Sequence, residues 1–215
     1  MGARLMFFFL LFLGLMSCQQ KCNHHGLSEV KNVKIDSLTR NRMEQMDKSI
    51  GVLVLSSNYK GELISIFNVD GSLWQSFRYI DTFSDNKISP LAFKPENALL
   101  VFKCLGKIDG FYKIIASENG KEIKLIKIQD ANFQFQTWEQ HLPTLFSVDF
   151  DINENPLRVE PNDTARSLPF NQENFYHPVK TEGDWLMLRH DDGTEGWVKW
   201  RDGNGDLLLE LYYES

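Results

Sequence analysis

The sequence lacks the short motifs that mark most enzyme classes. It contains no Gly-x-Ser-x-Gly elbow, no His-Glu-x-x-His pair and no glycine-rich phosphate loop. Its net charge at pH 7 is −6 and it has no long basic run, which disfavours nucleic acid as a partner because phosphate binding depends on clustered lysine and arginine. We therefore expect a protein without catalytic residues, cofactor or bound nucleic acid.

The chain also lacks an apolar run long enough to cross a bilayer. Arg4 precedes an apolar segment at residues 5–12, which closes on Ser17 and Cys18. A secretory signal consists of a basic residue, a short apolar region and a small residue before the cleavage site. The alternative is a transmembrane anchor, which needs about twenty apolar residues, and the polar residues 19–21 stop this run short.

A cysteine directly after the small residue resembles the bacterial lipoprotein pattern. That resemblance implies a signal peptide at residues 1–17 and acylation of Cys18, with palmitate among the possible chains, so that lipid anchors the protein at a membrane. It places the protein in the cell envelope. The absence of aspartate after Cys18 resembles outer-membrane lipoproteins, if the source is Gram-negative.

Cysteine is scarce, with three in the chain. Cys22 follows in the polar segment, and Cys104 lies within an apolar run. An exported protein can join two such residues, but a tether residue paired with a core strand residue is unusual, and buried free cysteine is common. The sequence leaves the pairing open and favours a packed thiol at Cys104.

Two acidic segments invite a catalytic or metal-binding interpretation. Asp149 and Asp151 flank Phe150 and, by strand alternation, share a solvated face, which explains them without catalysis. Residues 202–206 resemble the start of a calcium loop, but that loop needs glycine at its sixth position and glutamate at its twelfth. Leucine and tyrosine occupy those positions here, so we expect a hairpin turn and no metal site.

Short strands dominate the rest of the chain. Residues 18–48 are polar without a sustained period, as expected of a tether. Beyond them, residues 50–55, 62–68 and 72–79 are rich in β-branched and aromatic residues and are separated by glycine, asparagine and aspartate. Asp-Gly at 70–71 favours a hairpin between the last two. The class is therefore predicted to be all-β.

An internal repeat links the two halves of the chain. Residues 109–122 align without a gap onto residues 182–195, at an offset of 73 residues from Gly110 to Gly183. Each copy predicts an aromatic-led strand, an Asn-Gly or Asp-Gly turn and a return strand.

A second match lies upstream of the first. Residues 90–95 align with residues 156–161 at an offset of 66 residues. The second copy is therefore seven residues longer between its two matching segments. We place the insertion in a surface loop around residues 171–176.

The second copy resembles a known family. Pro-Leu-Arg-Val at 156–159, a long loop, Gly-Asp-Trp-Leu-Met-Leu at 183–188 and Gly-Trp-Val-Lys at 196–199 resemble the bacterial SH3 (SH3b) domain. The resemblance covers roughly residues 151–213. It is weaker over residues 84–130, where isoleucine and lysine replace the Gly-Trp pair.

The resemblance implies two SH3-like small barrels in tandem. The first repeat would lie within an N-terminal β region at residues 49–149, and the second domain would occupy residues 150–215. The alternative is a single irregular β-sandwich built by duplication. Residues 50–83 resemble no family that we can name.

The resemblance also implies a binding module for cell-wall peptide or an envelope protein, with an aromatic groove between the long loop and the sheet. An inhibitor or immunity-type lipoprotein that binds a secreted enzyme or toxin is the alternative. Trp197 and Trp200 differ in strand parity, so we expect at least one of them to be exposed. The candidate ligand-binding residues are Phe175, Tyr176, Trp185, Trp197 and Trp200.

Overall fold

The computed structural model describes residues 48–119, 122–171 and 175–213. The predicted signal peptide, Cys18, Cys22 and the tether up to residue 47 lie outside these residues, so the lipoprotein interpretation stays a prediction. Every described residue belongs to one compact unit.

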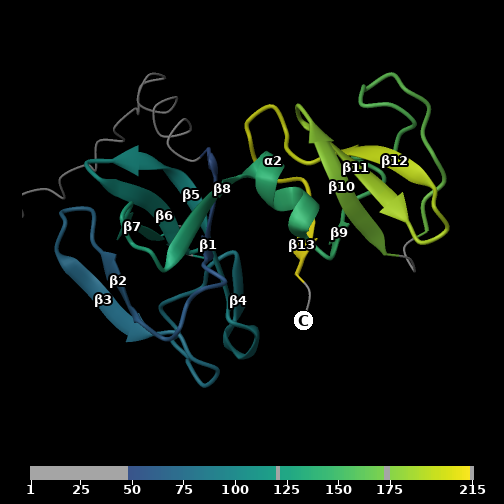
Figure 1. The fold of residues 1–215 in the computed structure, drawn as a ribbon. Coiled ribbons are helices and arrows are strands. Elements are labelled where there is room, and N and C mark those ends of the chain that lie inside the picture. Colours follow the sequence, from purple (N-terminus) through teal and green to yellow (C-terminus); the bar gives the residue numbers. More distant parts are fainter. Residues whose placement is uncertain (1–47, 120–121, 172–174, 214–215) are drawn as a thin grey trace, which may run out of the picture. The chain divides into compact units, whose positions relative to one another are not determined.

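The largest sheet has eight strands, all before residue 138 (Figure 1). Seven of them follow the order β3-β2-β7-β6-β5-β1-β8, and β4 pairs with β5. The strands are β1 (Gly51–Leu55), β2 (Leu63–Phe67), β3 (Leu73–Arg78), β4 (Ala92–Lys94), β5 (Leu99–Ile108), β6 (Phe111–Ser117), β7 (Glu122–Lys127) and β8 (Phe133–Thr137).

The all-β class predicted from the sequence is confirmed. The three strands expected at the start of the fold correspond to β1, β2 and β3, and β2 pairs with β3 as an antiparallel hairpin. At the turn, Gly71 has φ 82° and Asp70 Oδ1 accepts a hydrogen bond from the Ser72 amide at 2.9 Å. Both features are the turn chemistry that an Asp-Gly pair provides.

The eight-stranded sheet curls around its own core. Tyr112 on β6 stacks on Phe135 on β8 with ring centroids 5.5 Å apart, although β5 and β1 lie between these strands in the sheet. Ile64 and Ile66 on β2 are fully buried inside the curl. Alternate residues of β2 therefore point into a continuous hydrophobic cluster.

The central strands β1 and β5 are buried on both faces. Leu53 and Phe102 belong to the cluster inside the curl, whereas Val52 and Val101 belong to a second cluster on the opposite face. This explains why β1 and the first four residues of β5 carry no polar side chain, because both of their faces are covered, whereas β5 continues with Lys103 and ends in the exposed residues Lys107 and Ile108.

The described helices are short. The 3-10 helix η1 (Pro95–Asn97) joins β4 to β5, whereas the α-helix α2 (Trp138–His141) and the 3-10 helix η2 (Leu142–Thr144) lead from the large sheet to β9. Thr137 and Gln140 form a capping box at the start of α2. No helix in the described residues is both long and apolar enough to cross a membrane.

The second half of the described chain contains five strands in two small sheets. The three-stranded sheet has the order β10-β11-β12, and β9 pairs with β13. β13, the last described strand, therefore pairs with a strand that lies before residue 150, where the second domain was expected to begin. The strands are β9 (Ser147–Asp149), β10 (Tyr176–Glu182), β11 (Trp185–His190), β12 (Glu195–Lys199) and β13 (Glu210–Tyr212).

The sequence repeat corresponds to two hairpins. β6 and β7 form the first and β11 and β12 the second, both antiparallel. The upstream matching segments pair differently, because Ala92 on β4 pairs with Val101 on β5, whereas Arg158 pairs with Trp197 on β12. The duplication is therefore visible in the hairpins but not in the segments before them.

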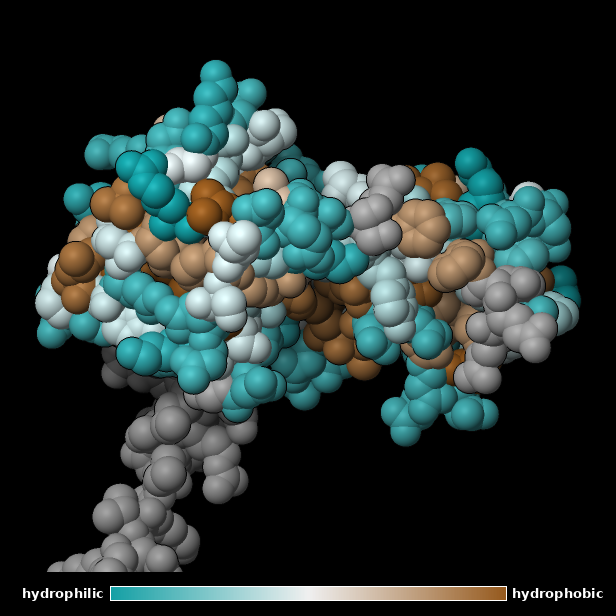
Figure 2. Space-filling model, turned by 90° about the horizontal axis from the view of Figure 1, so that it is seen from below, coloured by the Kyte–Doolittle hydropathy of each residue, from teal (hydrophilic) through white to brown (hydrophobic). Residues whose placement is uncertain are grey.

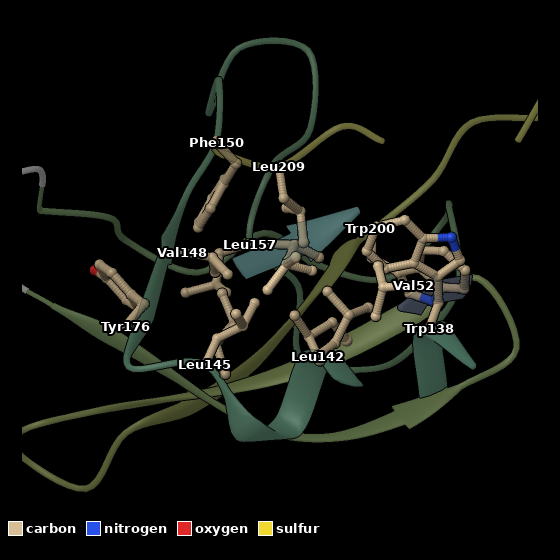
Figure 3. Packing of buried hydrophobic residues seen from close by; sticks show 14 residues of the cluster. Val52, Trp138, Leu142, Leu145, Val148, Phe150, Leu157, Tyr176, Trp200 and Leu209 are labelled. Carbon is tan, nitrogen blue, oxygen red and sulfur yellow. The ribbon is translucent and has the colours of Figure 1, made fainter. Parts of the chain in front are cut away.

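A shared hydrophobic cluster joins residues from both halves of the chain (Figure 3). Trp200 is fully buried and its ring lies 6.2 Å from that of Trp138, beside Val52 from β1. Around them lie further buried residues of the same cluster: Leu142, Leu145, Val148, Phe150, Leu157, Tyr176 and Leu209.

Candidate functional site

Strand alternation divides the predicted aromatic site residues between two faces of the β10–β12 sheet. Leu186, Leu188 and Val198 are fully buried on the core side. Trp185 and Trp197 lie on the opposite face, one step apart, because Trp185 pairs with Lys199 and Met187 with Trp197. The sheet therefore brings together two of the five predicted residues.

Trp200 is a core residue and not a ligand-facing one. It is fully buried, and its indole Nε1 donates a hydrogen bond to the Gly183 carbonyl at 2.9 Å. Trp197 is 9% exposed. The expectation that one of these two side chains is exposed is therefore wrong, because the segment around Arg158 pairs over the edge of β12 beside Trp197.

Lysines of the same sheet cover both remaining tryptophans. The Lys180 ammonium lies 5.3 Å from the Trp197 ring centroid, and the Lys199 ammonium lies 5.4 Å from the Trp185 ring centroid. Lys199 also pairs with Asp163 at 2.7 Å. These internal cation–π contacts occupy the ring faces that a ligand would use.

Tyr176 is also buried, which corrects the expectation that it lies on a surface loop. It begins β10 and points inward, with its ring stacked 4.9 Å from Phe170. Its hydroxyl accepts a hydrogen bond from the Asn171 amide at 3.1 Å. Its neighbour Phe175 is 56% exposed. The two consecutive rings therefore point in different directions, Tyr176 into the core and Phe175 toward solvent.

Phe175 belongs to an exposed aromatic pair. Its ring centroid lies 5.5 Å from that of Phe146, which is 41% exposed. His177 packs edge-on against Phe146 at 5.4 Å. The His177 ring is held by the Phe146 carbonyl at 2.6 Å and by Asp191 Oδ1 at 3.1 Å.

Phe146 was missed by the sequence reasoning. It lies just before β9, between residues that enter the core. Alternation would not have found it, because Phe146 has the same parity as Val148 and Phe150, which are buried. Only the fold shows that this ring meets Phe175.

A groove of about 490 Å³ lies along the outer side of the β9–β13 pair. Desolvation and the nearby carboxylates of Glu210 and Asp149 raise the pKa of Tyr212, which is 42% exposed at the same sheet. The groove residues are Asp149, Phe150, Asp151, Ile152, Asn153, Leu208 and Glu210. The predicted solvation of Asp149 and Asp151 on either side of buried Phe150 is confirmed.

The buried groups Cys104 and His141 both have pKa values shifted by burial. Cys104 is free and fully buried, and burial raises the pKa of its thiol to about 11, which confirms the packed thiol. Burial lowers the pKa of His141 to about 4. Within residues 48–119, 122–171 and 175–213, no group of three or more potential metal ligands is found.

The segment that resembled a calcium loop is a hairpin turn, as predicted. Asp202 Oδ1 accepts hydrogen bonds from the Asn204 amide at 2.8 Å and from the Asp206 amide at 2.9 Å. Gly205 adopts φ 88° and closes the turn. The Asp202 carboxylate thus accepts hydrogen bonds from backbone amides of its own turn.

No protein-family model, curated protein or solved structure matches this chain. Its function is therefore inferred from its residues and their geometry.

Proposed function

We propose that this chain is a non-catalytic, lipid-anchored protein of the cell envelope whose folded part binds a peptide or protein partner. The observation that supports this proposal is the exposed ring pair of Phe146 and Phe175. Aromatic rings dominate binding hot spots because they bury a large area with few rotatable bonds.

The Phe146–Phe175 pair differs from the other exposed apolar residues. Among the others, Leu63 and Leu73 are aliphatic side chains on β2 and β3, and Val69 lies in the turn between these strands. Isolated exposure of aliphatic side chains is common. On the face shown in Figure 2, brown and tan residues form patches that are bordered by teal ones. Phe146 and Phe175 instead form a pair of exposed aromatic rings in contact with each other.

The fixed position of the His177 ring beside Phe146 also supports binding. His177 is anchored at both nitrogens, and it packs against Phe146. A ring that is fixed before binding loses less conformational entropy when a partner arrives.

The SH3-like interpretation of the second half belongs to the same proposal. The two segments on which the resemblance depends meet in space, since Arg158 and Trp197 exchange two backbone hydrogen bonds of 2.8 Å. The resemblance to a family of binding modules is compatible with this pairing. The proposed contact surface lies at Phe175, one of the residues expected from the resemblance, together with Phe146.

The test compares the full chain with Phe175→Ala and with Leu73→Ala, a control that also shortens an exposed apolar side chain. Each protein is incubated with purified peptidoglycan and, separately, with solubilised envelope proteins, and the bound fraction is measured. We expect Phe175→Ala to reduce binding several-fold while Leu73→Ala leaves it unchanged. Equal binding by all three proteins would rule out the proposed surface.

A further inference from the structure

His177 connects three segments that lie apart in the sequence. Its ring projects from β10, and its Nδ1 lies 2.6 Å from the carbonyl oxygen of Phe146, which precedes β9. Its Nε2 lies 3.1 Å from Asp191 Oδ1, just after β11. The ring also packs edge-on against the Phe146 ring at 5.4 Å. His177 therefore contacts Phe146 at both its carbonyl and its side chain.

Both hydrogen-bond partners of the His177 ring can only accept. A backbone carbonyl has no proton to donate, and neither has an ionised carboxylate. Aspartate is ionised throughout the pH range in which histidine changes charge. A neutral imidazole has one N–H group, whereas the imidazolium has two. The two hydrogen bonds of His177 therefore exist together only when the ring is protonated.

In either neutral form of the ring, one of these bonds becomes a repulsive contact. If Nε2 carries the proton, the Nδ1 lone pair faces the Phe146 carbonyl oxygen at 2.6 Å. If Nδ1 carries the proton, the Nε2 lone pair faces the Asp191 carboxylate at 3.1 Å. The His177 side chain is 37% exposed, so water can replace either partner. Loss of the proton therefore removes one of the two bonds that hold the ring beside Phe146.

The Phe146 ring lies in contact with both Phe175 and His177. The ring centroids are 5.5 Å apart for Phe146 and Phe175 and 5.4 Å apart for Phe146 and His177. The Phe146 amide is held separately, by a hydrogen bond to the Tyr212 carbonyl at 3.0 Å. A change at His177 should therefore affect the position of the Phe146 ring without detaching this segment from the sheet.

The other charged side chains of β11 and its turn have partners of their own. Arg189 lies directly opposite His177 in the sheet, but it donates two hydrogen bonds to Glu195 Oε1, at 2.9 Å and 2.7 Å. His190 follows it, with its Nδ1 2.8 Å from Asp192 Oδ1. These charges are thus balanced within the β11–β12 hairpin.

The elements η2 and β9 also pack against β10. η2 has no titratable side chain, and the single one on β9, Asp149, accepts a hydrogen bond from the Phe150 amide at 2.8 Å. His141 precedes η2, and burial lowers its pKa to about 4. It therefore stays neutral at the pH values at which an exposed histidine changes charge.

We propose that protonation of His177 holds the Phe146–Phe175 pair in the arrangement that binds the partner, so that binding is tighter at acidic than at alkaline pH. The inference rests on the proposed binding function and adds its regulation. A ring that is held before the partner arrives loses less conformational entropy on binding. Histidine changes charge between about pH 5 and about pH 8, so moderate changes in pH are enough to change the affinity.

The first measurement follows the rings by NMR and needs no partner. The isotope-labelled full chain is titrated between about pH 5.5 and about pH 8. The ring nitrogens of His177 report its protonation, and the nuclear Overhauser effect between the Phe146 and Phe175 rings reports their contact. We expect this effect to weaken over the same pH range in which His177 loses its proton.

Two matched variants assign the effect to one carboxylate. Asp191→Asn supplies an amide that can donate to Nε2, so a neutral His177 can keep both hydrogen bonds. We therefore expect this variant to retain the contact between the two rings at about pH 8. Asp192→Asn makes the same change in charge at the next residue, which pairs with His190 instead. Its titration should match that of the native chain.

The second measurement applies the pH change to binding. The native chain, Asp191→Asn and Phe175→Ala are each incubated with peptidoglycan and with solubilised envelope proteins at about pH 5.5 and about pH 8. The difference between the native chain and Phe175→Ala is the binding that depends on the aromatic pair. This part should be several-fold larger at the acidic pH for the native chain and similar at both pH values for Asp191→Asn.

A ring contact that stays constant while His177 titrates would overturn the inference. A pH dependence that Asp191→Asn retains, or that Asp192→Asn loses, would assign the effect to another group and overturn it as well. If binding depends on Phe175 equally at both pH values, the binding function stands and its regulation by His177 is wrong. If no binding depends on Phe175, the binding function itself fails.

Discussion

The Leu157 side chain occupies the space where a side chain at Gly196 would begin: a Cβ at Gly196 would stand 2.6 Å from Leu157 Cγ. Leu157 is buried in the shared hydrophobic cluster, so it has little room to move. The neighbouring residues Arg158 and Trp197 exchange their two backbone hydrogen bonds at this point. Glycine at position 196 therefore permits the close approach of the two segments.

Gly196→Ala should destabilise the fold by about 1–3 kcal/mol, the usual cost of overpacking a filled core. The free energy of unfolding in urea measures this effect. Gly203→Ala is the matched control, because a Cβ there meets nothing within 4 Å, and its stability should stay close to that of the native chain. Equal stability of the two variants would show that Leu157 moves aside without cost.

Tyr176→Ala should lower the free energy of unfolding by about 3 kcal/mol, because it removes a buried ring stacked on Phe170. The adjacent substitution Phe175→Ala should change it by about 0.5 kcal/mol or less, as expected for an exposed side chain. Urea unfolding of both variants provides the comparison. A larger loss for Phe175→Ala than for Tyr176→Ala would contradict the assignment of the two rings.

Stability should fall as the pH decreases from about 6.5 to about 4 because of His141. Burial lowers its pKa from 6.5 to about 4, so in this window the unfolded chain binds a proton that the folded chain does not. The lost stability approaches about 3 kcal/mol below pH 4.

His141→Gln should remove this part of the pH dependence, measured as the free energy of unfolding at several pH values. The ring nitrogens of His141 face Gln136 Oε1 at 2.8 Å and the Tyr213 hydroxyl at 2.9 Å, so the variant will also lose some stability at neutral pH. If the native chain and the variant show the same slope between pH 6.5 and 4, another group is responsible.

A fragment of residues 150–215 should not unfold cooperatively. It lacks β9, the partner of β13, and it lacks Trp138 and Val52 from the cluster around Trp200. A fragment of residues 137–215 keeps β9 and α2 and should retain more of its strand signal in circular dichroism. A sharp thermal transition in the shorter fragment would instead support an independent second domain.

Cys18→Ala should move the protein from the membrane fraction to the soluble fraction. Acyl chains contribute about 0.8 kcal/mol per buried methylene, and stable attachment needs more than one chain. Immunoblots of separated fractions provide the measurement. Retention of the variant in washed membranes would contradict the lipoprotein interpretation.

Much of the fold was predictable because its signals are local. Short runs of aliphatic and aromatic residues predicted β1 to β3, and the Asp-Gly and Asn-Gly pairs predicted the β2–β3 hairpin and both repeated hairpins, since turn chemistry and strand composition depend on neighbouring residues. The match between residues 90–95 and 156–161 was less informative about strand pairing. The residues around Ala92 and Arg158 are alike in sequence, but their pairing partners are set by contacts far along the chain.

The candidate site was predicted less well, since a list of aromatic residues does not reveal which rings are buried. Trp200 and Tyr176 enter the core, and lysines cover Trp185 and Trp197. Of the five predicted residues, Phe175 is more than half exposed. Its partner Phe146 comes from a segment that no motif marked.

The sequence by itself determined the all-β class, the hairpin turns and the packed thiol, because alternation, glycine placement and apolar runs act over a few residues. The tertiary structure decided which rings meet water and which carboxylates face each other. The Phe146–Phe175 contact and the Asp149–Glu210 pairing each join segments distant in the chain, and such contacts depend on how the sheets pack.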